Sequence, residues 1–228
     1  MAIHILTHQP SVTGPLSRQG FQQKLDEYGL LITDLQANPL EHIWSSGFRK
    51  HDRQTVKYHE NTGCVFRFDD HADDFNNYLA LKEGPVWNRF DRPEFFASMR
   101  RTLGDALKFA IVTYEEKVIA GSMFLCDRAT SAAHLLSMRY STVNNMHSPV
   151  TYMNWMTAKW AAEQNLRFVD FGPWGTEHIN DPSHFAFKLM RRFEADFLPR
   201  YVFTIRPTGL AYSFARGIGK LVRTLRPE

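Results

Sequence analysis

The segments that decide the fold are SAAHLLSMRYS (131–141), TVNNMH (142–147), SPVTYMNWMTAKWAAEQ (148–164), LRFVDFG (166–172), PWGTEHIN (173–180) and DPSHFAFKLMRRF (181–193). They predict a strand, a turn, a helix, a second strand, a loop and a second helix, in that order. A strand, a helix and a strand in succession form a βαβ unit, so we expect Met138 and Phe168 to lie on parallel or near-parallel neighbouring strands. We also expect these two central strands to splay apart, and the helix around Phe187 to close one side of the resulting groove.

Both helices of this stretch begin with the same signal. Ser148 precedes Pro149, and Asp181 precedes Pro182. A small oxygen-bearing residue at the cap, followed by proline at the first helical position, is typical of a helix start. The helix that opens at Ser148 should therefore offer free backbone N–H groups and the positive end of its dipole to an anionic ligand.

The composition is that of an ordinary globular protein. The chain has 228 residues, of which 43% are hydrophobic and 22% are charged. Its two cysteines, Cys64 and Cys126, are too far apart for a metal-binding motif, and a disulfide framework is not expected. Neither a secretory leader nor a membrane-spanning apolar run is visible, which predicts a cytoplasmic location.

Basic residues gather in two places. From Arg191 to the end, eight basic residues stand against three acidic ones, although the whole chain has a net charge of only +3. The pattern over Ala211–Leu225 predicts an amphipathic basic helix, which either touches a membrane surface or packs on its own domain. In a helix predicted from Pro39 to about Glu60, basic residues spaced four apart line one face: Arg49, Arg53 and Lys57. Either region binds phosphate-rich partners, such as a nucleotide, tRNA or an anionic membrane, or is simply a solvated helix face.

Periodicity and turn residues predict the other elements. Strands are expected over Leu30–Leu35, Cys64–Phe68, Leu107–Tyr114, Lys117–Asp127, Ala133–Ser141, Leu166–Gly172 and Tyr201–Ile205. Helices are expected over Asp70–Leu81, Pro93–Leu103 and Pro149–Gln164, with a loop over Glu83–Arg92 and an irregular segment over residues 1–20. The helix Pro149–Gln164 is apolar nearly all round, which predicts that it is sandwiched between other elements.

Four short motifs, in the same order, resemble those of one protein family. They are RQTVK (53–57) followed by Gly63, FAIVTYEEKVIAG (109–121), RFVDFG (167–172) and FAFKLMRRF (185–193). Over about residues 30–205, the chain resembles the GNAT acyltransferases, and among them the Fem family of peptidoglycan aminoacyltransferases and the BioF-like acetyltransferases. This resemblance implies an α/β (α+β) GNAT-like fold with a mixed, mostly antiparallel central sheet flanked by helices.

The resemblance also suggests how the chain is divided. Residues 1–62 would be a lead-in, strand and basic helix remaining from a first GNAT-like half, 63–206 the acyltransferase domain, and 207–228 a basic amphipathic helix. Fem enzymes carry two GNAT-like domains, and a homodimer is one way to replace the missing half. Residues 142–147 contain no glycine, whereas CoA-using GNAT enzymes have a glycine-rich pyrophosphate loop at this point. This departure favours an aminoacyl-tRNA donor over acyl-CoA.

The resemblance places the reaction centre on the last of these motifs. Lys188 occupies the lysine of the family's F-K motif, which makes it the leading catalytic candidate; the alternative is an exposed lysine on an amphipathic helix. His184 lies four residues earlier and is expected on the same helical face. Asp170 shares the inward face of its strand, where it either orients a catalytic group or caps the loop Gly172–Gly175.

Substrate-binding candidates surround the predicted helix start. Arg139 and Tyr140 end their strand near Ser148 and are candidates for holding a donor phosphate or carboxylate. Further candidates for the cleft lining are aromatic or histidine side chains, each with a core or turn role as the alternative: His147, Tyr152, Trp174 and Phe187.

The predicted function is transfer of an aminoacyl or acyl group onto an amine of a cell-envelope precursor or small metabolite. No permanently bound cofactor and no metal are expected, and the donor is aminoacyl-tRNA or acyl-CoA. A conventional acyl-CoA N-acyltransferase and a non-catalytic binding module on the same fold are the two alternatives. tRNA, a peripheral membrane contact and a second copy of the chain are the predicted partners.

Overall fold

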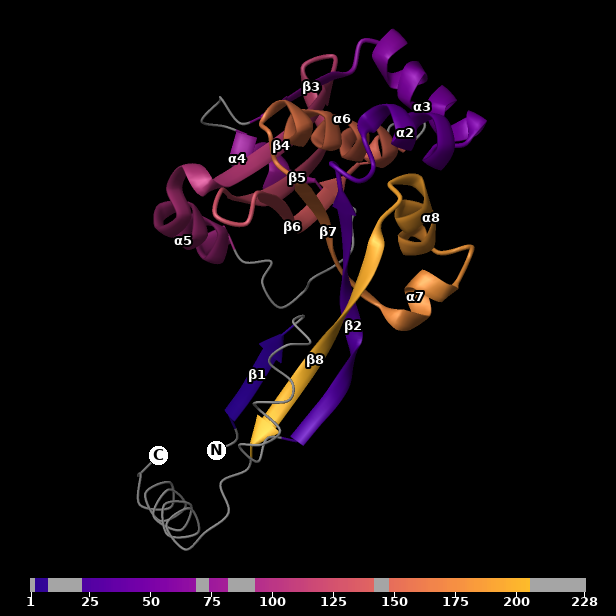
Figure 1. Ribbon diagram of the computed structural model, residues 1–228. Coiled ribbons are helices and arrows are strands. Elements are labelled where there is room, and N and C mark those ends of the chain that lie inside the picture. The colour runs from indigo at the N-terminus through magenta and orange to yellow at the C-terminus, as the bar shows by residue number, and fades with distance from the viewer. Residues whose placement is uncertain (1–2, 8–21, 69–73, 82–92, 142–147, 206–228) are drawn as a thin grey trace, which may run out of the picture. The chain divides into compact units, whose positions relative to one another are not determined.

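The computed structural model, shown in Figure 1, describes residues 3–7, 22–68, 74–81, 93–141 and 148–205. The predictions for Glu83–Arg92, Thr142–His147 and Ala211–Leu225 lie outside these residues. The chain forms two compact units, one of Met1–Gly29 with Pro199–Glu228 and one of Leu30–Leu198. The division predicted at residues 62 and 206, with 1–62 as the remainder of a first GNAT-like half, stays a prediction.

The strands are β1 (Ile3–Thr7), β2 (Gln22–Asp34), β3 (Val65–Phe68), β4 (Leu107–Tyr114), β5 (Lys117–Asp127), β6 (Ala132–Tyr140), β7 (Phe168–Gly175) and β8 (Asp196–Ile205). The helices are α2 (Leu40–His42), α3 (Lys50–Asn61), α4 (Asp74–Ala80), α5 (Pro93–Leu103), α6 (Val150–Glu163), α7 (Thr176–Asn180) and α8 (Phe185–Arg192), with a π-helix η2 (Ile43–Gly47) and a 3-10 turn η3 (Gly104–Ala106).

The sheet of the Leu30–Leu198 unit runs in the order β2, β7, β6, β5, β4, β3. Strands β3 to β6 pair antiparallel in sequence order, because tight turns join β4 to β5 and β5 to β6. Strand β7 returns parallel to β6 after the α6 crossover, as the βαβ pattern predicts. The predicted fold class, mixed α/β with a mostly antiparallel sheet, is therefore confirmed.

Both faces of this sheet are covered. In β4, Ala110 and Val112 belong to the hydrophobic cluster that includes α6, whereas Phe109 and Ile111 belong to a cluster on the other face with Tyr78 of α4. The alternation follows from the period of two along a strand. Helix α6 contacts β4, β5, β6, β7 and α3. This confirms that its all-round apolar character reflects a sandwiched position.

The predicted helix from Pro39 to Glu60 is interrupted. Gly47 lies so close to α8 that a side chain there would overlap the backbone carbonyl of Arg192, and the helix breaks at this contact. The chain extends at Phe48 and Arg49 before α3 begins at Lys50. The prediction of one continuous helix from Pro39 to Glu60 is therefore wrong. The three basic residues expected on one face all follow the break, because Arg49 is the N-cap of α3 and Arg53 and Lys57 lie within it.

Several predicted bounds also shift. Strand β1 occupies part of the segment predicted to be irregular, and β2 is longer than Leu30–Leu35. A short helix, α7, forms in the predicted loop over residues 173–180. In the first unit, β1 pairs antiparallel with β8, with Ile3 opposite Ile205 and Thr7 opposite Tyr201. An antiparallel ladder needs a partner that a single segment does not reveal, so this strand was invisible to local patterning.

Candidate active site at the separation of two strands

The candidate site lies where two central strands of the sheet separate. Strands β6 and β7 pair over Ala132–His134 and Phe168–Asp170, and within the described residues their ladder ends there. A hollow of about 20 Å³ lies between the diverging strands. Beyond it is a cavity of about 300 Å³, lined by Met138, Tyr140, Ser148, Val150, Trp174, His184 and Phe185. The groove predicted between the splayed strands is therefore present, and α8 closes one side of it through His184 and Phe185 rather than through Phe187.

The start of helix α6 borders this cavity, although not in the predicted way. Pro149 occupies the N-cap position, α6 begins at Val150, and no side chain caps the helix. Ser148 is exposed and lines the cavity instead. Its hydroxyl is therefore available to a ligand, and the N–H groups of the first helical turn lie beside the same space.

His184 is the N-cap of α8. Its Nδ1 accepts a hydrogen bond of 3.1 Å from the backbone N–H of Ala186. Asp181, predicted to cap this helix, instead accepts from the N–H and hydroxyl of Ser183 in a separate turn, so α8 begins later than expected. Because Nδ1 is the acceptor, the neutral imidazole carries its proton on Nε2.

The protonation of His184 is biased by its surroundings. Burial lowers the pKa of His184, and the neighbouring His178 lowers it further, while Asp181 and Glu177 partly oppose the shift. The rings of His178 and His184 stack with centroids 4.2 Å apart, and Trp174 packs against both. His184 is therefore held neutral near pH 7. His178 was not among the predicted site residues. It lies six residues before His184 and in a different helix, so no helical periodicity connects the two.

Asp170 of β7 lies opposite His134 of β6 at the last paired position of the two strands. Its Oδ2 accepts a hydrogen bond of 3.0 Å from His134 Nδ1, and its Oδ1 accepts one of 2.8 Å from the N–H of Gly172. Gly172 adopts a φ of 87°, a conformation that glycine adopts without strain. Asp170 is only 4% exposed and does not line the 300 Å³ cavity. These contacts match the capping role that was one of its two predicted alternatives.

The His134–Asp170 pair should make stability depend on pH. The hydrogen bond to Asp170 raises the pKa of His134 above the ordinary value of a histidine side chain. The pair therefore stabilises the fold fully below the unfolded-state pKa, and this contribution is lost as pH rises through the folded-state pKa. We expect His134→Gln to lower the free energy of unfolding more at pH 5.5 than at pH 8.5, measured by urea titration. An equal or larger loss at pH 8.5 would contradict this assignment.

The structure distributes the remaining candidates differently from the prediction. Lys188 is exposed one helical turn after His184 and does not line the cavity, and Phe187 does not line it either. The positive charge of Lys188 nevertheless lowers the pKa of both Asp181 and His184. A catalytic role for Lys188 stays a prediction.

Two binding candidates serve other elements. The Arg139 guanidinium donates to the backbone carbonyls of Leu79 and Leu81, so it anchors the end of α4. Tyr152 is buried, donates to the Cys64 carbonyl and stacks on His59, and burial raises its pKa to about 12. Neither side chain lines the cavity, whereas Tyr140, Ser148 and Trp174 do.

The residues predicted to bind phosphate, Arg49, Arg53 and Lys57, also have different surroundings from one another. The Arg53 guanidinium donates to backbone carbonyls of Trp44, Ser45 and Phe48 at the end of η2. Arg49 is the N-cap residue of α3, and its backbone N–H donates to Asp52. Lys57 is exposed. Arg53 is thus committed to the helix break, which sequence spacing alone could not show.

The family of the chain follows from a comparison with known protein families. Residues 46–188 match the acetyltransferase (GNAT) domain. The match spans more than half of the chain, so the chain belongs to this family and carries a GNAT acyltransferase domain. A search of the curated proteins found no match. None of the helices in the described ranges combines the length and apolar character that a membrane crossing requires.

Solved structures share this fold. The C-terminal domain of a putative lysylphosphatidylglycerol synthetase from Agrobacterium fabrum is 15% identical, with a TM-score of 0.61 over 94% of this chain and 70% of that chain. L-PGS from Bacillus licheniformis is 14% identical, with a TM-score of 0.62 over 90% of this chain and 68% of that chain. FemX is 12% identical, with a TM-score of 0.64 over 88% of this chain and 71% of that chain. At these identities the likeness shows the fold.

Proposed function

We propose that this domain transfers an aminoacyl or acyl group from an activated donor onto an amine of a cell-envelope precursor or small metabolite. The observation that supports this most directly is the cavity at the strand separation, which combines a helix start, a serine and a neutral histidine. Apolar walls with a few convergent polar groups are typical of sites for small molecules.

The chemistry requires little beyond alignment and charge stabilisation. The amine nitrogen attacks the acyl carbon and a tetrahedral oxyanion forms. The ester or thioester bond to the donor then breaks, and the proton lost by the nitrogen passes to the leaving oxygen or sulfur. In this proposal His184, which lines the cavity and carries its proton on Nε2, donates to the developing oxyanion. The start of α6 adds the positive end of its dipole.

The aminoacyl alternative has two supports. One structural relative is named as a putative lysylphosphatidylglycerol synthetase, and the product in that name is a lysyl group attached to phosphatidylglycerol. The segment 142–147 also lacks the glycine that close approach to a pyrophosphate favours. Use of tRNA, contact with a membrane surface and formation of a homodimer remain predictions.

A cavity-filling substitution tests the proposed function. Ser148 is exposed and lines the cavity, so Ser148→Trp should fill the space without disturbing the core. We expect aminoacyl or acyl transfer to fall by at least about tenfold, because a small misplacement of the reacting groups is costly. The measurement is transfer to an amine acceptor, with aminoacyl-tRNA and acetyl-CoA as alternative donors, alongside the melting temperature.

Ser98→Trp is the matched control, because Ser98 is exposed on α5 and does not line the cavity. It should leave transfer unchanged. Full activity of Ser148→Trp with both donors would contradict placement of the reaction in this cavity. A rise in melting temperature with CoA, together with transfer from acetyl-CoA, would instead favour the conventional acyl-CoA enzyme.

A further inference from the structure

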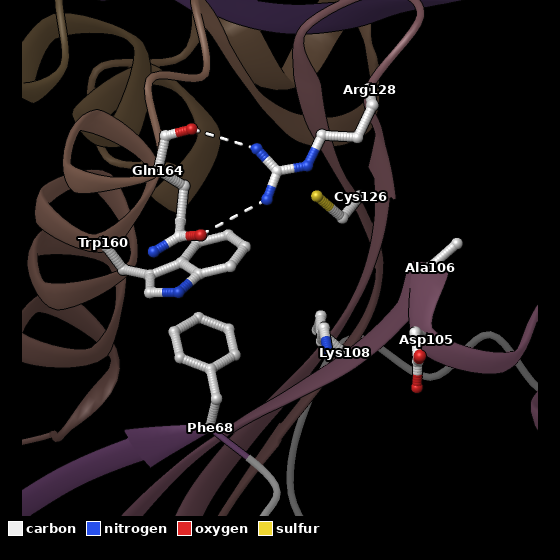
Figure 2. Close-up of a pocket in the computed structure, with 8 residues that line it drawn as sticks. All are labelled: Phe68, Asp105, Ala106, Lys108, Cys126, Arg128, Trp160 and Gln164. Atoms are coloured by element: carbon white, nitrogen blue, oxygen red, sulfur yellow. Dashed lines mark hydrogen bonds between the residues drawn. The ribbon is translucent and has the colours of Figure 1, made fainter.

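A second and larger cavity lies at the other end of helix α6. It has a volume of about 440 Å³ and is shown in Figure 2, lined by Phe68, Asp105, Ala106, Lys108, Cys126, Arg128, Trp160 and Gln164. The first cavity borders the start of α6, whereas Trp160 and Gln164 lie at its end. At 1.5 Å per residue, the helix separates the two by roughly 20 Å. The proposed transfer reaction does not use this second space.

One wall of the second cavity is aromatic. The rings of Phe68 and Trp160 lie with their centroids 4.1 Å apart and their planes inclined by 31°. Figure 2 shows the two side chains adjacent, Trp160 coming from α6 and Phe68 from the end of β3. A flat apolar ring suits such a wall, because aromatic rings pack well in offset and edge-to-face arrangements.

The same cavity contains two cationic side chains. Arg128 is fixed in place, because its guanidinium donates to the backbone carbonyl of Gln164 at 3.0 Å and to its side-chain oxygen at 3.3 Å. Lys108 is only partly exposed and, among the residues that the structure describes, has no hydrogen bond or ion pair. Asp105 is the one acidic side chain in the described lining, so the lining has a net positive charge.

We propose that this cavity is a second binding site, for a small ligand that joins a flat ring to an anionic group. The ring would pack against Phe68 and Trp160, and the anionic group would lie between Lys108 and the remaining N–H donors of Arg128. A partly buried lysine that has no partner among the described residues gains most from a charged ligand, since hydrogen bonds between charged groups are stronger than neutral ones. The volume lies within the range of small-molecule sites.

Calorimetry with four probes tests the ligand class. Adenosine 5′-monophosphate and indole-3-acetate each combine a ring with an anion, whereas adenosine supplies the ring alone and inorganic phosphate the charge alone. We expect one of the two combined probes to bind at least about tenfold more tightly than adenosine and phosphate. If neither combined probe binds more tightly than adenosine or inorganic phosphate, the proposal is overturned.

A charge substitution assigns the binding to this cavity. Lys108→Met should weaken the favoured probe by about tenfold, because the ammonium is removed while most of the side-chain volume remains. Lys117→Met is the matched control, since Lys117 is exposed at the start of β5 and does not line the cavity. Equal affinities of the two variants would overturn the assignment.

Cys126 provides a second readout that does not depend on a substitution. It lines the cavity, and Figure 2 shows its sulfur directed towards Trp160 and the Arg128 guanidinium. At ten times its dissociation constant, the favoured probe should slow alkylation of Cys126 by about tenfold. Cys64 is also buried and free but does not line this cavity, so its alkylation should not change. Unchanged alkylation of Cys126 would contradict binding at this place.

Discussion

Replacing Asp52 with asparagine should lower the free energy of unfolding by about 3 kcal/mol, which is the largest stability effect that we expect of a single change. Asp52 accepts a hydrogen bond of 2.8 Å from Arg192 Nε and one of 3.1 Å from the backbone N–H of Arg49, and it forms an ion pair of 2.6 Å with Arg192 Nη2. The side chains of Asp52 and Arg192 are 6% and 14% exposed. Asparagine therefore leaves a guanidinium buried without its counter-charge, and urea unfolding measures the loss.

The matched control is a second Arg–Asp pair with similar geometry and much greater exposure. Asp34 accepts hydrogen bonds from Arg167 at 3.0 Å and 2.7 Å, and the Arg167 side chain is 48% exposed. Asp34→Asn should cost no more than about 1 kcal/mol, because water screens the pair and solvates a freed guanidinium. Equal losses from Asp34→Asn and Asp52→Asn would show that burial does not set the strength of the inner pair.

The largest effect on activity should come from His184→Asn. Asparagine is a good N-cap, so it should keep the hydrogen bond to the Ala186 N–H and the start of α8. It removes the Nε2–H donor that the proposed mechanism assigns to His184, which lines the cavity. We expect kcat for transfer to fall roughly 10²-fold, the cost of removing one oxyanion donor, with little change in melting temperature.

Two further variants separate chemistry from folding at this position. His184→Ala removes the cap as well as the donor, so it should lower stability by about 1 kcal/mol in addition to losing activity. Lys188→Ala should reduce activity less than His184→Asn, because Lys188 is exposed and does not line the cavity. If Lys188→Ala instead abolishes transfer while His184→Asn retains it, the lysine predicted from the family motif is the catalytic group.

Local patterns predicted much of the fold. The expected bounds of Leu107–Tyr114, Lys117–Asp127 and Pro93–Leu103 agree with β4, β5 and α5. These elements carry their own signals, since alternation, tight polar turns and a proline at the helix start are all local. The parallel pairing of β6 and β7 was also predictable, because a strand–helix–strand order permits few other topologies.

The features that escaped prediction depend on contacts between distant parts of the chain. The helix break at Gly47 arises where its backbone meets that of Arg192. The His134–Asp170 hydrogen bond requires the register of two strands, which no single segment specifies. For the same reason the second cavity was not predicted, since its lining is assembled from β3, η3, β4, β5 and α6 and from the turn after β5.

The early end of the β6–β7 ladder has a consequence for selectivity. Beyond His134 and Asp170, no strand among the described residues pairs with the facing sides of β6 and β7, so two strand edges open in the middle of the sheet. Main-chain amides along such edges that have no partner within the protein are hydrated before a ligand arrives. A ligand that brings its own amides can replace those lost water contacts one for one, whereas a bare hydrocarbon of equal size cannot. The gap should thus favour peptide-like chains over fatty ones.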